Sequence, residues 1–94
     1  MVAIEKRMVR RTDDPLGEYR EIILYQAEGS LHCVWEATGF LSDADVSFAQ
    51  RQQLATGTRE NMQQRFTEIV QGLCDDGFSV CERDSSAAIA DKAQ

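Results

Sequence analysis

The sequence predicts an α+β domain in which an antiparallel sheet of about five strands carries one long amphipathic helix on one face. Two observations support this fold class. Short segments of alternating or β-rich residues, separated by turn residues, fill the first half of the chain, and a single stripe of apolar residues with helical spacing follows them. A last short apolar segment gives the chain order ββββαβ.

The first two predicted strands are joined by a turn. Residues 2–11 alternate loosely between apolar and charged side chains, and residues 19–27 are rich in apolar and aromatic ones, so both are predicted strands. Residues 13–17 between them read Asp-Asp-Pro-Leu-Gly. In such a turn, aspartate bonds the backbone ahead, proline fixes φ and glycine supplies a positive φ.

The third and fourth predicted strands follow a hairpin. Residues 28–30 form its short loop and residues 31–36 form the returning strand. We expect residues 37–45 to form a longer loop. Residues 46–54 are the predicted fourth strand, because three apolar side chains lie in phase along them: Val46, Phe48 and Leu54.

The helix is predicted by five apolar residues that fall on one stripe: Met62, Phe66, Ile69, Val70 and Leu73. Thr58 is the predicted N-cap, because its side chain can accept a hydrogen bond from a backbone N–H of the first turn. Gly77 is predicted to end the helix, since glycine adopts the left-handed conformation readily. Residues 78–82 are predicted to form the last strand.

Length and composition predict one domain. The 94 residues are 43% hydrophobic and 28% charged, which is ordinary globular composition. We expect residues 1–83 to form this domain and residues 84–94, which carry no apolar stripe, to form a flexible tail. No apolar run approaches the roughly 20 residues of a membrane span, and the N-terminal segment lacks the features of a secretory signal. A cytoplasmic location without membrane contact is predicted.

The residues typical of catalysis do not form a recognisable motif. His32 is the only histidine, and Cys33 beside it should point to the opposite face of a strand, so these two cannot form a dyad. A thiol enzyme would need Cys74 or Cys81 next to His32. The cysteines form no CxxC pair, and no phosphate loop, nucleophile elbow or zinc-binding helix is present. We therefore predict no enzyme activity, no catalytic residue, no metal and no cofactor.

The charge balance disfavours nucleic acid as a partner. Residues 1–20 hold five cations and four acids (+1), and the rest holds five cations and twelve acids (−7), which gives a net charge of −6. An acidic surface repels a phosphate backbone. The basic cluster of the first strand is split by alternation, with Arg7 and Arg11 on one face and Lys6 and Arg10 on the other. No aromatic residue stands between them to stack on a base.

The second predicted strand is apolar on both faces. Ile22 and Leu24 point one way and Ile23 and Tyr25 the other, and Trp35 extends the pattern in the third strand. A strand with one solvated face should alternate apolar and polar residues, and one helix covers one face only. Two questions stay open: which face the helix covers, and whether the sheet closes on itself instead. The predicted protein-binding residues, two of them in the predicted loop, are Ile23, Tyr25, Trp35, Phe40 and Leu41.

These observations predict a small acidic interaction protein, an adaptor or inhibitor, that acts through protein–protein contacts as a homodimer. A second copy is the first partner to consider, because symmetric dimers are the commonest oligomers, and another protein is the second. Two alternatives come from other classes. One is a nucleic-acid-binding module that uses the basic first strand, and the other is a small thiol-dependent enzyme that uses His32 with Cys74 or Cys81.

Overall fold

The computed structural model describes residues 1–13, 17–42 and 45–81 of the chain. The elements along it are β1 (Val2–Arg11), β2 (Glu18–Gln26), β3 (His32–Ser42), β4 (Asp45–Gly57), α1 (Arg59–Asp75) and β5 (Phe78–Val80). The α+β class and the order ββββαβ predicted from the sequence are confirmed. No helix among the described residues is long and apolar enough to cross a membrane. The predicted tail, residues 84–94, lies outside the described residues.

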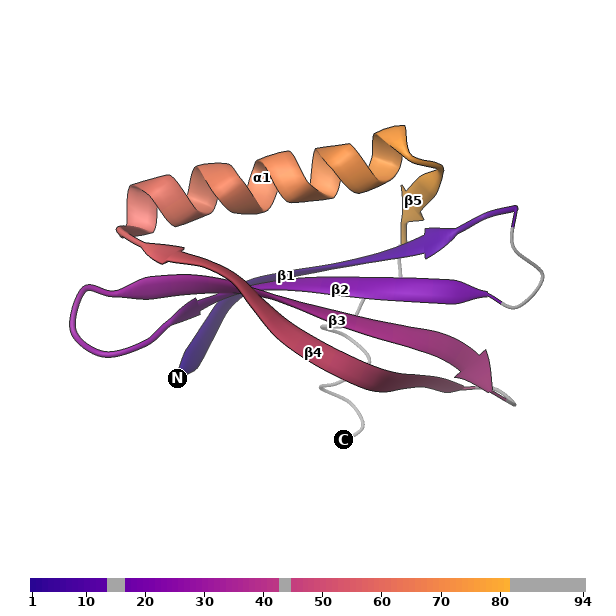
Figure 1. Cartoon of the computed structure of the whole chain (residues 1–94), viewed down its shortest axis with the longest axis horizontal. Helices are drawn as coiled ribbons and strands as arrows, with labels where there is room; N and C mark the ends of the chain where they lie inside the picture. The colour runs from indigo at the N-terminus through magenta and orange to yellow at the C-terminus, as the bar shows by residue number, and fades with distance from the viewer. Residues whose placement is uncertain (14–16, 43–44, 82–94) are drawn as a thin grey trace.

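The strands form one antiparallel sheet in the spatial order β4-β3-β2-β1-β5. Strands β1 to β4 are neighbours in sequence as well as in space, and the chain returns through α1 to add β5 beside β1. Figure 1 shows α1 lying along one side of the sheet. In this view the strands cross one another left of the centre and spread apart toward the right, as expected from the right-handed twist of β-strands.

The helix packs on the sheet through its apolar stripe. Met62 and Phe66 are buried against Ile22, Leu24 and Val34 of the two central strands. Burying a large apolar side chain stabilises the fold by about 1.5–3 kcal/mol, so these contacts hold the helix in place. The remaining residues of the predicted stripe pack against this cluster and are half-buried: Ile69, Val70 and Leu73.

Both predicted ends of the helix are confirmed. Thr58 is the N-cap, and its Oγ1 accepts a hydrogen bond from the backbone N–H of Asn61 at 3.2 Å. Gly77 follows the C-cap Asp76 and has a φ of 105°, a conformation that glycine adopts without a steric penalty. The Gly77 N–H donates to the Cys74 carbonyl oxygen at 3.2 Å, which closes the last turn.

The prediction of a loop over residues 37–45 is wrong, because β3 continues to Ser42 and β4 begins at Asp45. Gly39 suggests a turn in the sequence, but its role is to admit a close neighbour. A Cβ at Gly39 would lie 2.5 Å from the Ser47 carbonyl oxygen and 2.7 Å from the side chain of Phe48. A glycine within a strand often marks such a close approach of another backbone.

Strand β4 is longer than the predicted segment 46–54 and is irregular. Its register against β3 shifts twice, so that Ala49 and Leu54 each lack a paired residue on β3. Each is a β-bulge, which bends its strand and increases the local twist. The bulges change the alternation, so Leu54 is not in phase with Phe48 as predicted and is 38% exposed.

An ionic cluster on the helix side fixes β5 to the sheet. Arg20 donates hydrogen bonds to Glu18 at 2.8 Å and to Glu36 at 2.9 Å. The guanidinium groups of Arg11 and Arg20 lie over the Phe78 ring, at 4.4 Å and 5.5 Å from its centroid. Burial alone would lower the pKa of Arg20, but the hydrogen bonds and charges of Glu18 and Glu36 outweigh it and raise that pKa. Arg20 therefore stays charged, and its guanidinium connects carboxylates of β2 and β3 with Phe78 of β5.

Candidate interaction site on the helix-free face of the sheet

The structure shows which side of β2 the helix covers. Ile22 and Leu24 pack under α1. Successive side chains of a strand alternate, so Ile23 and Tyr25 point to the opposite side, which we call the helix-free face. Directly paired residues of antiparallel neighbours share a face. Trp35, which pairs with Ile23, therefore belongs to the helix-free face as well.

The helix-free face consists of cross-strand rows that run from β4 to β1. Gly39 and Ala37 occupy neighbouring rows in the middle of β3, and these small side chains leave room for large neighbours. Phe48 uses this room, because its ring lies directly over Gly39. In order along the sheet, the rows are Phe48, Gly39, Tyr19 and Arg10; then Arg51, Ala37, Glu21 and Met8; then Gln53, Trp35, Ile23 and Lys6; then Thr56, Cys33, Tyr25 and Ala3.

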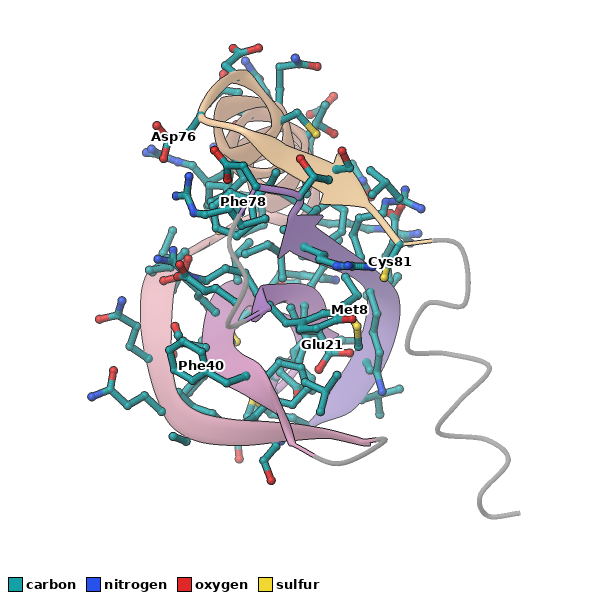
Figure 2. All side chains as sticks on the ribbon, turned by 90° about the vertical axis from the view of Figure 1, so that its right-hand side faces the viewer. Met8, Glu21, Phe40, Asp76, Phe78 and Cys81 are labelled. Atoms are coloured by element: carbon teal, nitrogen blue, oxygen red, sulfur yellow. The ribbon has the colours of Figure 1, made fainter. Side chains whose placement is uncertain are left out.

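Much of the helix-free face is buried although the helix lies on the other side. Ile23 is 3% exposed, and Ala37 and Glu21 are also buried. Figure 2 shows how this arises: viewed end-on, the sheet bends round, and the labelled Met8 and Glu21 lie inside the bend. The burial of Ile23 therefore needs no second chain. The apolar pattern that predicts an interface at Ile23 is also satisfied within one chain.

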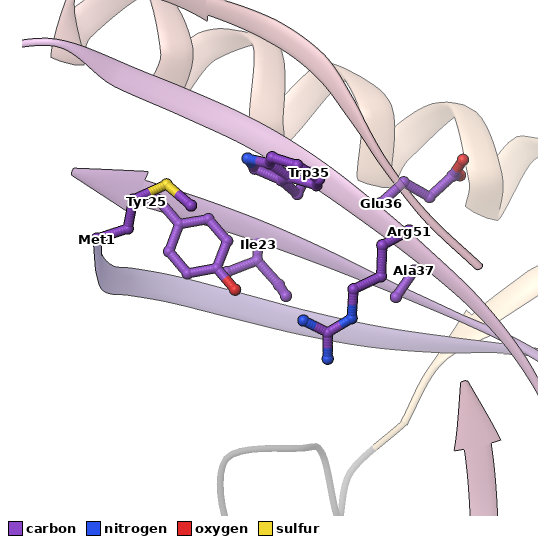
Figure 3. A pocket seen from close by; sticks show the side chains of 7 residues that line it. All are labelled: Met1, Ile23, Tyr25, Trp35, Glu36, Ala37 and Arg51. Carbon is purple, nitrogen blue, oxygen red and sulfur yellow. The ribbon is translucent and has the colours of Figure 1, made fainter. Parts of the chain in front are cut away.

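A pocket of about 120 Å³ stays open on this face between Tyr25, Trp35 and Arg51. Figure 3 shows the two aromatic side chains beside the pocket and the Arg51 guanidinium extending toward Ile23. Tyr25 and Trp35 are half-buried, whereas Arg51 is exposed. Three of the predicted site residues thus line this pocket: Ile23, Tyr25 and Trp35. The rest of the lining is Met1, Glu36 and Ala37.

Two side-chain atoms of this face are buried without a hydrogen-bond partner: Oε2 of Glu21 and Nε1 of Trp35. No side-chain atom on the helix-covered face, within the described residues, is in this situation. Most buried polar atoms in proteins have a partner, and an unsatisfied one costs about 1–3 kcal/mol. A local cost of this kind without an evident gain for the fold is typical of a functional site.

The other two predicted site residues do not join the pocket. Phe40 lies an even number of positions after Val34 in β3, so both side chains are on the helix side of the sheet. Phe40 pairs with Glu18 at the start of β2. Its side chain is 44% exposed. Leu41 belongs to β3, but its side chain lies outside what the structure describes. Phe40 and the pocket are therefore separate features of the surface.

Three cations border the helix-free face. Lys6 and Arg10 come from β1, on the side that the sequence alternation predicts, and Arg51 comes from β4. Glu21 is the only acid in the rows given above, so this face is locally positive on a chain with net charge −6. Sequence reasoning missed Glu21 and Arg51 as site residues. Their common row depends on the β3–β4 register, which the bulges of β4 shift.

The structure does not bring His32 together with Cys74 or Cys81. His32 pairs with Gln26 at one end of β2, whereas β5, which leads to Cys81, pairs with the part of β1 that lies opposite Arg20, at the other end of β2. Six residues of strand separate Gln26 from Arg20, which corresponds to about 20 Å. Cys74 is in the last turns of α1, at the same end as β5 (Figure 1). All three cysteines are free thiols.

Comparison of the chain with protein-family models, with curated proteins and with solved structures finds no match. Within the described part of the chain, no group of three or more His, Cys, Asp or Glu side chains could hold a metal ion. The pocket, the two unpartnered polar atoms and the bordering cations are the features from which a function can be inferred.

Proposed function

We propose that this protein is a non-catalytic interaction module that binds a partner protein at the pocket between Tyr25, Trp35 and Arg51. The observation that carries the proposal is the buried, unpartnered indole N–H of Trp35 beside an open apolar pocket. An apolar side chain of the partner would fill the pocket, and the Trp35 ring would turn on binding so that its N–H, buried in the free protein, donates to a partner oxygen. Tyrosine, tryptophan and arginine are the residues most enriched in binding hot spots.

The size of the pocket limits what it contributes. One buried apolar side chain contributes about 1.5–3 kcal/mol and one hydrogen bond about 1 kcal/mol, which is less than a stable complex needs. The pocket therefore acts as an anchor, and further contacts around it must complete the interface. Arg51 is exposed at the pocket, where its guanidinium can pair with a carboxylate of the partner.

The experiment captures partners from a cell extract on immobilised protein and quantifies them by mass spectrometry. The pocket variants are Tyr25→Ser and Arg51→Glu, and the matched control is Arg65→Glu, which makes the same charge change on the exposed surface of α1. We expect one partner whose capture falls by roughly tenfold or more in the pocket variants and is unchanged in the control. The purified partner should also change the fluorescence of Trp35, the only tryptophan. Equal capture by all variants would refute the proposal.

A second candidate, single-stranded nucleic acid, is favoured by one specific observation. The face that carries Tyr25 and Trp35 is bordered by Lys6, Arg10 and Arg51. Aromatic side chains that stack on bases, next to cations that contact phosphates, are the usual means of binding single strands. No aromatic residue lies between the cations in the sequence of β1, but the neighbouring strands place Tyr25 and Trp35 on the same face as these cations. The net charge of −6 still disfavours this candidate.

Salt dependence separates the two candidates. A thymidine oligonucleotide of about 12 nucleotides is titrated into the protein at about 50 mM and about 500 mM NaCl, with Trp35 fluorescence as the signal. Quenching that saturates at low salt and weakens by orders of magnitude at high salt would support nucleic acid. No quenching at either salt concentration supports the protein partner.

A further inference from the structure

We infer that the free edge of β4 pairs with β4 of a second copy of this chain and so forms an antiparallel homodimer. Among the residues that the structure describes, β4 is the last strand on its side of the sheet, with β3 as its neighbour. It has 13 residues, whereas β5 at the opposite edge has three. An edge strand of this length presents a row of unpaired backbone N–H and C=O groups, which another strand can pair with.

The composition of β4 leaves this edge poorly protected. Natural proteins guard edges with lysine, proline and charge, but β4 has neither lysine nor proline, and its only charged residues are Asp45 and Arg51. A chain with net charge −6 thus has a nearly neutral edge, where two copies can approach with little repulsion. The bulges at Ala49 and Leu54 give partial protection. They confine regular pairing to the segment 50–53 between them.

Symmetry and charge select the register of this pairing. If the two-fold axis of the dimer is perpendicular to the joined sheet, residues opposite each other on the two β4 strands lie on the same face. The axis then passes between one residue and the same residue of the second copy. An axis at Arg51 would oppose two guanidinium groups, which is destabilising. An axis at Gln50 or Gln53 would place a bulged residue in the pair directly next to the axis. An axis at Gln52 avoids the Arg51 pair and keeps residues 51–53 of the two copies opposite one another before the bulge at Leu54 is reached, and it sets Arg51 opposite Gln53 of the second copy.

This pairing has a defined strength and a consequence for the pocket. Three regular residues per chain make an interface below the roughly 1,200 Å² of stable complexes, so we expect a weak dimer with a dissociation constant of about 1 μM or more. The helix-free faces of the two copies continue into each other, with Arg51 at the seam. The inference adds self-association to the proposed role. The two surfaces share Arg51, but Tyr25 belongs to the pocket alone, because β3 lies between its strand β2 and the edge of β4.

The test changes the charge at position 53 in opposite directions. Gln53→Glu would set a carboxylate opposite Arg51 of the second copy, and Gln53→Arg would set a like charge there. Because the pair occurs twice in each dimer, we expect the dissociation constant to fall about two- to thirtyfold with Gln53→Glu and to rise by a similar factor with Gln53→Arg. Sedimentation equilibrium from about 1 μM to about 1 mM chain covers the expected range. Gln64→Glu and Gln64→Arg make the same charge changes on exposed α1.

Opposite shifts at Gln53, with little change at Gln64, support the inference. A chain that stays monomeric at about 1 mM overturns it, because even a weak dimer is populated there. Equal responses at Gln53 and Gln64 also overturn it, since they report net charge alone. A dimer whose dissociation constant does not change with the Gln53 substitutions, but that is lost in Tyr25→Ser, would refute pairing at the β4 edge. It would indicate that the chains associate through the pocket. Partner capture that fails while the Gln53 shifts occur refutes the proposed function and leaves the dimer intact.

Discussion

The two faces of the sheet are buried to a similar degree but differ in what they bury. Under the helix, Ile22 and Leu24 are fully buried in an apolar cluster. On the helix-free face, Ile23 is buried almost as deeply, yet Glu21 and Trp35 have buried polar atoms without partners there. Burial depth therefore does not distinguish the core under the helix from the proposed binding site. The state of the buried polar atoms does.

The difference indicates which face stabilises the fold and which face carries a cost. Net stabilities of domains are only about 5–15 kcal/mol, so two unsatisfied polar atoms at about 1–3 kcal/mol each are a substantial part. An apolar residue in place of Glu21 would avoid part of this cost. The helix-covered face shows that this chain can build a core without such a group.

The largest effects test whether both faces are core within one chain. Ile22 and Ile23 are 0% and 3% exposed. We expect Ile22→Asp and Ile23→Asp each to unfold the domain, because a lone buried charge costs more than the net stability of a small domain. Circular dichroism measures the loss of structure. A folded Ile23→Asp variant that changes only its oligomeric mass would show instead that Ile23 lies at an interface.

The next effect concerns the helix-covered face alone. Phe66 is 2% exposed against the apolar cluster, and we expect Phe66→Ala to lower the free energy of unfolding by about 3–5 kcal/mol, measured by urea denaturation. Val80→Ala is the control, since Val80 is 46% exposed on β5 and its truncation should cost under about 0.5 kcal/mol. A loss under about 1 kcal/mol for Phe66→Ala would mean that the stripe does not lie on the sheet.

A smaller effect should have opposite signs on the two faces. Glu21→Met removes a buried carboxylate whose Oε2 has no partner, and we expect the free energy of unfolding to rise by about 1–3 kcal/mol. Glu36→Met, on the helix side, removes a carboxylate that accepts hydrogen bonds from Arg20 and Gln52, and we expect a fall of about 1–3 kcal/mol. Thermal or urea denaturation compares the two. Equal losses would show that Glu21 is as well satisfied as Glu36.

Much of the fold was predictable because its signals are local. The N-cap Thr58, the apolar stripe of the helix and the strand alternation of residues 2–11 each follow from neighbours in sequence. The loop predicted over residues 37–45 is wrong because Gly39 is explained by a contact with Phe48 on another strand. A single sequence shows no sign of that contact.

The candidate site divides in the same way. Alternation along β2 and β3 was enough to group Ile23, Tyr25 and Trp35, which line one pocket. The row that joins Arg51 to Glu21 needed the β3–β4 register, and two bulges that the sequence does not announce set that register. The bend that buries Ile23 could not be predicted either, because it arises from bulges and twist over the whole sheet.

The smallest expected effect concerns the single histidine. His32 is 5% exposed, and its Nδ1 lies 2.9 Å from the Ser30 carbonyl oxygen, so its contacts are those of a structural residue. It pairs with Gln26 and Gly57, near the start of α1, whereas Cys81 is about 20 Å away along the strands. Partner capture and self-association should therefore stay within about threefold in His32→Ala, since neither surface includes this side chain.

The measurement is meaningful only for a folded variant, which circular dichroism establishes first. If the protein's biological activity, once it is identified, falls by orders of magnitude in folded His32→Ala, the thiol-enzyme alternative is favoured over an interaction module. In that case Cys74→Ser or Cys81→Ser should reproduce the loss, because the thiolate is the nucleophile in such chemistry. Fast alkylation of the same cysteine near neutral pH should accompany it. If His32→Ala alone has the effect, the imidazole acts without a thiol, and neither predicted pair of residues explains it.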